Sequence, residues 1–353
     1  MKNRNYCAVH LLIAFWFTLL CGIDLCAAVI QDKVLICGIC KNVERAVPNT
    51  IASIDALGSK FIDYQVVIYE NNSTDKTKEL FQEWEKQDPH VIFLSEDLTK
   101  KELAQQVTMK VANRTEVLAR ARNIVLDVVM KKQYDDFKYV IWADLDFLDL
   151  WDVANVVDTI LHPEQEWDAV FANGLYDLFA LRDAEFPIGF ELLGKCYWGL
   201  LDQIRTRLIA NPPIQWRKVY SAFGGLGIYK RESLKGCHYS GVVTKELERL
   251  VATWLEQIGE NNGVCLFTEY RHLLGSVPVI TLKQEVVQKR KHHPDELGVR
   301  LHNQHGDGKV TWFSCTKKRT LPWTCEHIPL HAQMIVRGHD KLYINPRIKS
   351  NHP

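Results

Sequence analysis

Short apolar runs alternate with amphipathic segments along the chain from residue 33 onward. The apolar runs are rich in β-branched or aromatic residues and end at polar residues or glycine, which is typical of strands. Between them, apolar residues recur at helical spacing. We therefore predict strands over 33–39, 64–70, 90–94, 137–146 and 167–174, and helices over 48–58, 75–87 and 115–132. This alternation indicates an α/β fold, with a mostly parallel, Rossmann-like sheet and helices on both faces.

The pattern is looser after about residue 184. Residues 221–233 predict a glycine-rich turn that leads into a strand, and residues 245–260 predict an amphipathic helix. Residues 289–309 are polar and rich in histidine, as expected of a surface loop. Because no internal repeat or long low-complexity linker occurs, we expect residues 185–353 to be an extension built against the first sheet, not an independent module.

The first 28 residues differ from the rest of the chain. Lys2 and Arg4 precede an apolar run over about 7–23, and the small residues Ala27 and Ala28 follow. This order predicts a secretory signal peptide, while the length of the run also suits an uncleaved membrane anchor. Both alternatives predict a protein of the secretory pathway or one associated with a membrane.

Composition and charge narrow the function classes only slightly. The 353 residues are 47% hydrophobic and 24% charged, which is typical of a globular protein with a sizeable core. Lysines and arginines equal aspartates and glutamates at 43 each, so the net charge indicates no nucleic-acid partner. Seven of the ten cysteines follow the N-terminal segment, an odd number that cannot all pair internally. We interpret Cys37 and Cys40 as buried strand residues, because no second such pair completes a zinc site.

Asp144 and Asp146 come at the end of the fourth predicted strand. In parallel sheets, ligands bind beyond the carboxyl ends of the strands, so these carboxylates should face a ligand crevice. Carboxylates bind hard divalent cations such as Mg²⁺ and Mn²⁺, which keep coordination positions open for phosphate oxygens. We predict a metal or phosphate role for this pair. Asp149 and Asp152 are interpreted instead as the cap and the first turn of a following helix.

Two further segments carry polar side chains that could meet a ligand. In "VVIYENNSTDKTKEL" a strand runs into Glu70 and Asn71, which could contact a ribose or a base edge; an ordinary strand-to-helix turn is the alternative. In "RTEVLARARNIVLD" Arg122 and Asn123 lie in an apolar helix. Arginine can bind phosphate oxygens through two N–H groups, and the alternative is an arginine on a solvated helix face.

The blocks "YENNSTDKT", "RARN" and "YVIWADLDF", in this order, resemble the nucleotide-diphosphosugar glycosyltransferases of the GT-A fold. The resemblance implies that 29–184 form the nucleotide-sugar-binding half and 185–353 the acceptor-side half of one GT-A domain. It implies that Asp146, together with Asp144, binds a Mn²⁺ or Mg²⁺ ion. The donor contacts that it implies are Glu70, Asn71, Arg122, Asn123 and Asp144, with Asn71 in place of one carboxylate of the usual acidic pair.

A second set of blocks resembles the fungal capsule-associated α-mannosyltransferases and related bacterial proteins. These blocks are "VFANGLYDLFALRD" at 170–183, "SAFGGLGIYKRE" at 221–232 and "CEHIPLHAQMIVRGHDKLYINPRI" at 325–348. His327 and His331 are four residues apart, so a helix would place both on one face. The resemblance implies that a histidine of this segment completes the metal site. It also implies a donor such as GDP-mannose or a UDP-sugar.

Taken together, the residues predict a metal-dependent glycosyltransferase that acts on a glycan or another hydroxyl acceptor. An inverting reaction needs a carboxylate to take the acceptor proton, and Asp183, Asp177 and Glu326 are the candidates. A retaining reaction needs no dedicated base, and both stereochemical outcomes stay open. Asp177 and Asp183 could instead form a salt bridge with Arg182. Two other functions stay open: a catalytically inactive glycan-binding protein and a metal-dependent phosphoester hydrolase.

Overall fold

The computed structural model describes residues 29–107, 114–184, 214–260 and 323–350, with short pieces at 189, 201, 204–206, 208–209, 300–301 and 310–311. The predicted leader over 1–28 lies outside the described residues, as does the predicted loop over 289–309 except at 300–301. Within the part that is described, no helix is both long enough and apolar enough to cross a membrane.

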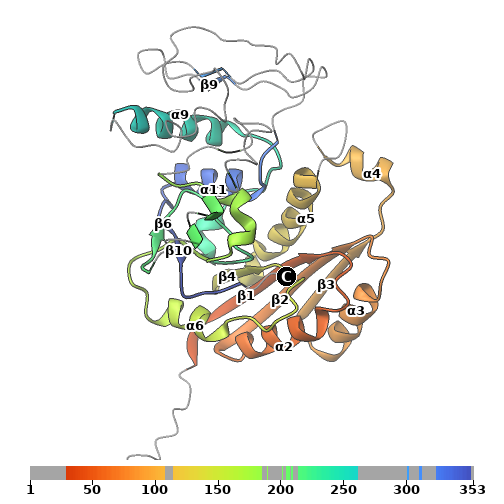
Figure 1. Cartoon of the computed structure of the whole chain (residues 1–353). Helices are drawn as coiled ribbons and strands as arrows, with labels where there is room; N and C mark the ends of the chain where they lie inside the picture. Colours follow the sequence, from red (N-terminus) through yellow and green to blue (C-terminus); the bar gives the residue numbers. More distant parts are fainter. Residues whose placement is uncertain are drawn as a thin grey trace, which may run out of the picture.

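An eight-stranded mixed sheet forms the centre of the molecule (Figure 1). The strand order across it is β3 (Val91–Glu96), β2 (Phe61–Asn71), β1 (Ile30–Cys40), β4 (Phe137–Ala143), β7 (Leu226–Lys230), β5 (Ala169–Ala172), β10 (Leu342–Asn345) and β6 (Arg217–Lys218). β1 pairs in parallel with β2 and β4, as do β2 with β3 and β10 with β5. β7 runs antiparallel to both β4 and β5, and β6 runs antiparallel to β10.

Helices cover both faces of this sheet (Figure 1). One face packs against α2 (Val47–Gly58), α3 (Thr77–Gln87) and α6 (Val153–Leu161). The other packs against α5 (Arg114–Val129), α9 (Lys245–Glu260) and α11 (His327–Val336). The smaller elements are α4 (Lys100–Gln105), η1 (Lys132–Tyr134), η2 (Leu175–Ala180), η3 (Arg231–Leu234), β8 (Arg300–Leu301) and β9 (Val310–Thr311). The predicted α/β class, with a mostly parallel sheet and helices on both faces, is confirmed.

The central strand β4 is buried on both sides. Val140 and Trp142 belong to the core beneath α5 and α11, whereas Ile141 and Ala143 belong to the core on the α2 side. Successive side chains of a strand point to opposite faces, so a strand covered on both faces needs apolar residues at every position. This explains the uninterrupted apolar sequence before Asp144.

The strand ends at Ala143, and both aspartates of the pair follow it, as expected of carboxylates placed where the strand leaves the core. The roles predicted for Asp149 and Asp152 were wrong. Helix α6 begins at Val153, and Asp152 is its N-cap, because the Asp152 carboxylate accepts a hydrogen bond from the backbone N–H of Asn155. Asp149 lies before the cap and is exposed.

The second half of the chain completes the sheet instead of packing against it. β7, β10 and β6 all come from residues after 184, and β7 lies between β4 and β5 of the first half. An antiparallel strand can join a parallel sheet when the chain returns from the opposite direction. The two halves therefore share one set of backbone hydrogen bonds.

Cys37 and Cys40 are buried free thiols in β1, which confirms their interpretation as strand residues. Burial raises the pKa of the Cys37 thiol well above its ordinary value, so this group stays protonated. Cys237 and Cys325 are likewise buried and free. The four thiols act as small apolar side chains of the core.

Candidate active site

The loops that follow β1 and β2 are tied together at the carboxyl edge of the sheet. The backbone N–H of Asn42 donates to Oγ of Ser73 at 3.0 Å, and Oδ1 of Asn42 accepts from the N–H of Thr74 at 2.8 Å. The backbone N–H of Val43 donates to Oγ1 of Thr77 at 2.7 Å. Side chains here satisfy backbone groups that no strand partner reaches, so these hydrogen bonds join the two segments to each other.

Glu70 supports the second of these loops from below. Its carboxylate is fully buried, accepts from the backbone N–H of Ser73 and accepts from Oγ of Ser95 at 2.7 Å. Asn71 is only half-buried, and its amide donates to Oδ1 of Asn72 at 3.0 Å. Of these two predicted donor contacts, Glu70 is buried and holds the loop, whereas Asn71 is more accessible.

Asp144 and Asp146 lie just beyond β4 in different environments. One oxygen of Asp144 is 3.3 Å from Nη2 of Arg122, and the other accepts from the Tyr176 hydroxyl at 2.7 Å. The backbone N–H of Asp144 donates to the carbonyl of Gly225 at 2.8 Å. Burial raises the pKa of the Asp144 carboxyl, while Arg122 and the Tyr176 hydrogen bond oppose that rise. Asp146 is exposed.

Arg122 is a buried cation that links the end of β4 to α11. Its Nε donates to Oε1 of Glu326 at 3.1 Å, 204 residues away in the chain. Burial alone would lower the pKa of the guanidinium, but Glu326 and then Asp144 raise it, so the group stays charged. Its Nη1 has no hydrogen-bond partner within the described ranges. The guanidinium carbon lies 4.9 to 5.8 Å from the centroids of three rings, those of Phe223, Tyr239 and Trp142.

The two aspartates of the "YDLFALRD" block lie in different places. Asp177, in η2, accepts from the backbone N–H of Gly224, and burial raises the pKa of its carboxyl well above the ordinary value, with Asp144 and Glu326 adding to the rise. Asp183 is buried and forms a close ion pair with Arg217 of the edge strand β6. Asp177 therefore lies close enough to Asp144 for the two charges to interact, whereas Asp183 is paired with Arg217.

His327 is buried beside Arg122, and neither of its ring nitrogens has a hydrogen-bond partner among the described residues. Its ring stacks on Phe223, with the centroids 4.0 Å apart. Burial, Arg122 and His331 lower the pKa of His327 well below its ordinary value, so the ring is neutral. A buried polar side chain without a partner is rare in folded proteins and points to an interaction with a bound group.

His331 lies one helical turn further along α11 but serves the core. Its Nδ1 is 2.8 Å from Oγ of Ser221, and its Nε2 is 3.0 Å from the hydroxyl of Tyr229. Burial lowers the pKa of the ring to about 3. Because both nitrogens already have partners, His331 has no nitrogen left for a metal ion in this arrangement.

Asn123 also has a structural role. Its amide donates to the carbonyl of Tyr239 at 2.9 Å and its side-chain oxygen accepts from the N–H of the same residue at 2.8 Å. This reciprocal pair holds the segment after η3 against α5. Both hydrogen-bonding groups of Asn123 are thus engaged with the protein backbone.

A divalent cation fits the carboxylate pair only together with phosphate oxygens. Across the described ranges, no three His, Cys, Asp or Glu side chains come close enough together to hold a metal ion. Arg122 and Tyr176 each take one acceptor position on the Asp144 carboxylate, and each oxygen keeps a second. Mg²⁺ is typically bound by one or two carboxylates plus substrate phosphates. Asp144 and Asp146 suit that mode of binding.

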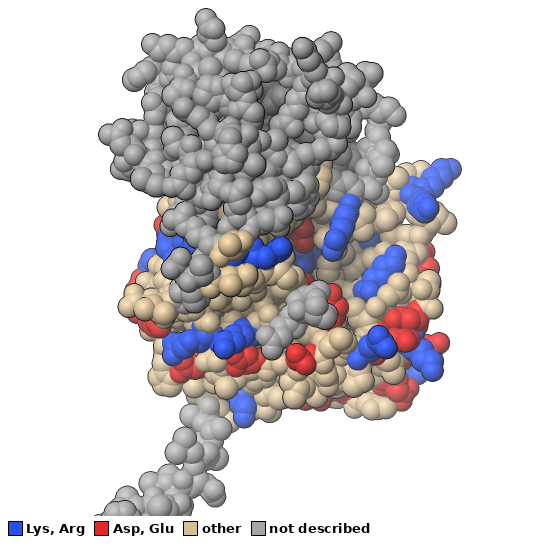
Figure 2. Space-filling model, viewed as in Figure 1, with Lys and Arg blue, Asp and Glu red and all other residues tan. Residues whose placement is uncertain are grey.

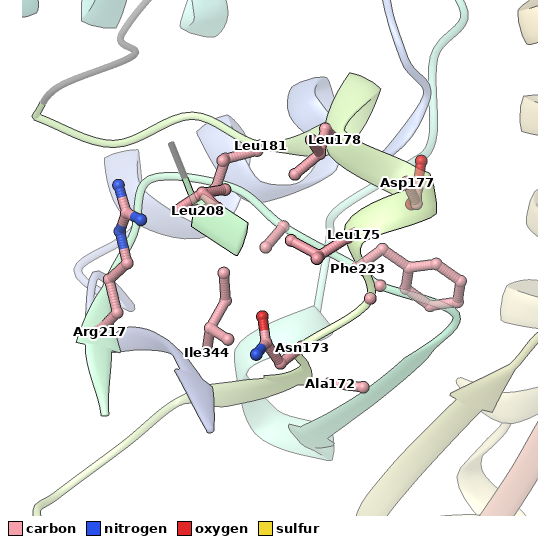
Figure 3. A pocket seen from close by; sticks show the side chains of 13 residues that line it. Ala172, Asn173, Leu175, Asp177, Leu178, Leu181, Leu208, Arg217, Phe223 and Ile344 are labelled. Carbon is pink, nitrogen blue, oxygen red and sulfur yellow. The ribbon is translucent and has the colours of Figure 1, made fainter. Parts of the chain in front are cut away.

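A pocket lies beside this centre, between η2, the end of β5 and the glycine-rich segment (Figure 3). Asp177 and Phe223 lie on one side of it and Arg217 on the opposite side. Its free volume is about 20 Å³, which holds a water but not a sugar. On the face of the molecule drawn in Figure 2, basic and acidic side chains are interspersed.

Residues 33–239, more than half of the chain, match the family described as Cryptococcal mannosyltransferase 1. The chain belongs to this family. The match confirms the predicted resemblance to the capsule-associated mannosyltransferases, and with it the prediction of a glycosyltransferase. No curated protein is similar enough to match.

Several solved glycosyltransferase structures are similar at low identity. The mannosyltransferase PcManGT from Pyrobaculum calidifontis, in complex with GDP-Man and Mn²⁺, has a TM-score of 0.35 and 13% identity over 74% of this chain and 71% of its own. Glucosyl-3-phosphoglycerate synthase from Mycobacterium tuberculosis, with Mn²⁺ and UDP, has a TM-score of 0.33 and 14% identity over 65% and 66%. TarS from S. aureus has a TM-score of 0.33 and 13% identity over 63% and 55%.

Sequence reasoning did not assign roles to three aromatic residues of this centre. Tyr176 contacts Asp144, while Phe223 and Tyr239 surround Arg122. Tyr176 and Phe223 lie within the blocks that carried the mannosyltransferase resemblance, which was the available signal. No sequence signal marked Tyr239, because its position depends on the hydrogen bonds between its backbone and Asn123.

Proposed function

We propose that this member of the mannosyltransferase family transfers a hexose from a nucleotide-diphosphosugar to a hydroxyl of a glycan acceptor. The observation that carries the proposal is the arrangement at the end of β4. Asp144 is held by Arg122 and Tyr176, and the exposed Asp146 lies beside it. Such a pair at the carboxyl edge of a sheet suits a cation that is shared with a diphosphate. GDP-mannose is the first donor to test because of the family's name, and UDP-sugars are the second.

In this proposal Asp146, supported by Asp144, would hold Mn²⁺ or Mg²⁺. The ion would supply charge stabilisation for the leaving nucleoside diphosphate. Arg122 contributes a permanent positive charge at the same place, because its neighbours keep it protonated. His327 is the histidine proposed to meet the metal or a donor oxygen, since neither of its nitrogens has a hydrogen-bond partner among the described residues and Nε2 lies 3.7 Å from Oε1 of Glu326. His331 is not included.

Among the three carboxylates considered for proton transfer, Asp177 is the one that we retain. Asp183 is paired with Arg217, and Glu326 is paired with Arg122, so a proton on either would break a buried ion pair. Asp177 accepts a hydrogen bond from the backbone N–H of Gly224, and burial raises the pKa of its carboxyl, which makes the ionised carboxylate a stronger proton acceptor. A carboxylate with a raised pKa is suited to take the proton of an acceptor hydroxyl.

The first test is a panel of GDP- and UDP-sugars with the full chain and Mn²⁺, measured as nucleoside diphosphate release and as thermal stabilisation. We expect one donor to give both signals, and EDTA to remove them. Asp146→Asn should reduce metal-dependent turnover by about 10- to 100-fold at least, since groups that only support a metal ligand already contribute that much and Asp146 would be a direct ligand. Asp149→Asn changes an exposed aspartate of the same segment and should leave both signals unchanged.

The other two functions predict different outcomes. Cleavage of phosphoesters without an acceptor sugar would favour a hydrolase. Glycan binding that survives Asp146→Asn, with no turnover of any donor by the unmodified chain, would favour a catalytically inactive binding protein. The absence of stabilisation by every nucleotide sugar would overturn the proposed function.

A further inference from the structure

Tyr176 reaches the metal-site carboxylate from an element that is separate from the strand carrying it. It lies in η2, and its hydroxyl donates to Oδ2 of Asp144 at 2.7 Å. Arg122 approaches the opposite oxygen, Oδ1, at 3.3 Å. A carboxylate on a short side chain can rotate about its terminal torsion unless both oxygens are held. The two contacts fix this rotation from both sides.

Gly225 makes room for the tyrosine. Its φ is +84°, and a Cβ on this residue would lie 2.2 Å from the Tyr176 hydroxyl and 2.4 Å from Cζ of Phe147. Its carbonyl also accepts from the backbone N–H of Asp144. Gly225 therefore anchors the Asp144 backbone while its missing side chain leaves space for the group that binds the Asp144 carboxylate.

We propose that Tyr176 is a positioning residue that orients Asp144 for metal and diphosphate binding, and that Gly225 is the glycine that permits this contact. The inference rests on the proposed function, since it concerns the same metal site. Side chains that hydrogen-bond to a metal-binding carboxylate set its direction, and their loss typically weakens metal binding or activity by about 10- to 100-fold. Tyr176 itself need not touch the metal or the sugar.

The direct test is Tyr176→Phe in the full chain, with the affinity for Mn²⁺ measured by electron paramagnetic resonance in the presence of GDP. We expect affinity to fall by about 10-fold or more. The metal-free melting temperature should change little, because phenylalanine keeps the edge-to-face contact with Phe147. Tyr64→Phe is the matched control: it removes a tyrosine-to-aspartate hydrogen bond, to Asp88, that involves neither Asp144 nor Asp146. It should leave Mn²⁺ affinity unchanged.

A second pair of variants tests the role of the glycine. Gly225→Ala and Gly338→Ala both place a side chain at positive φ, of +84° and +91°, but a Cβ at Gly338 meets nothing within 4 Å. Both should lower the melting temperature through backbone strain, whereas only Gly225→Ala should also weaken Mn²⁺ binding. In the Tyr176→Phe background the extra loss from Gly225→Ala should shrink, because the two residues act through one contact.

The outcomes distinguish failure of the positioning role of Tyr176 from failure of the proposed function. If the unmodified chain binds no Mn²⁺ with GDP or UDP, the proposed function fails. If it binds Mn²⁺ and Tyr176→Phe binds it equally well, the positioning role is wrong while the proposed function stands. Equal losses in Tyr176→Phe and Tyr64→Phe would also overturn the inference, since the effect would then be a general consequence of losing a hydroxyl.

Discussion

At the scale of single residues, the centre of this protein depends on one buried cation. Arg122 bonds to Glu326 and Asp144 and lies against the Phe223 ring. Removing one partner of a buried ion pair leaves an uncompensated charge in a medium that solvates it poorly, and this typically costs more than the pair itself contributes. The arginine therefore serves stability as well as the site.

We predict that Arg122→Leu lowers the free energy of unfolding by about 3–5 kcal/mol, because Glu326 is left buried without its cation. Urea unfolding followed by tryptophan fluorescence measures this change. Adding Glu326→Leu to Arg122→Leu should recover part of the loss by removing the unpaired carboxylate. Lys341→Ala, which breaks an exposed ion pair with Glu166, is the control and should have little effect. A loss as small as that of the control would contradict the assigned role.

At the scale of elements, α11 combines core and site functions within two turns. Among the described residues, His327 lies beside Arg122 without a hydrogen-bond partner, whereas His331 bonds to two buried hydroxyls. Both rings are buried and neutral. A spacing of four residues placed both on one side of the helix, as the sequence predicted, but the neighbours on β7 and on the segment before it gave them different roles.

The neutral histidines predict a loss of stability in acid. The pKa of His331 is about 3 in the folded protein and near 6.5 when exposed. Between these values the unfolded chain binds a proton at this site that the folded chain does not, so stability falls as pH drops from about 6.5 towards 3, by about 1.4 kcal/mol per pH unit. His327 acts in the same direction.

His331→Gln tests this prediction, since glutamine offers one donor and one acceptor to the same hydroxyls. The free energy of unfolding, measured with urea from pH 7 to pH 4, should decline less steeply with pH than in the unmodified chain. The difference in slope should correspond to about one fewer proton taken up on unfolding. His162→Gln, at an exposed ring 3.0 Å from Asp158, is the comparison for the loss of a histidine outside the core. An identical slope in all three proteins would rule out a buried neutral His331.

At the scale of the whole molecule, the sheet joins the two halves of the chain. β7 comes from the second half and bonds to β4 on one side and β5 on the other. Without it, two strands of the first half would expose unpaired backbone groups along their edges, which favours misfolding and aggregation. The candidate site also needs both halves of the chain, since Arg122 comes from the first half and its partner Glu326 from the second.

We therefore expect the described domain to unfold as a single cooperative unit. Far-UV circular dichroism and tryptophan fluorescence should give coincident urea transitions. A fragment of residues 29–184 should fail to fold, because it lacks β7. A soluble, folded 29–184 fragment would contradict this dependence on β7.

Hydrophobic periodicity was sufficient to predict the α/β class, the parallel strands of the first half and the position of the Asp144 pair, because these depend on local patterning and on the burial of both sheet faces. It failed for residues whose role depends on distant neighbours. Nothing near Asp183 in sequence indicates Arg217 as its partner, and nothing near Asp152 distinguishes a cap from a first-turn residue.

Local patterning in the sequence was enough to predict the class of fold, the family blocks and the carboxylates at the end of β4. Which of the candidate residues act together depended on how the chain folds. The tertiary structure paired Arg122 with Glu326, brought Tyr176 to Asp144, and separated His327 from His331 by their hydrogen bonds. The physical reason is that strand and helix formation depend mainly on local pattern, whereas charge pairing and hydrogen-bond satisfaction in a buried site depend on contacts between segments far apart in the chain.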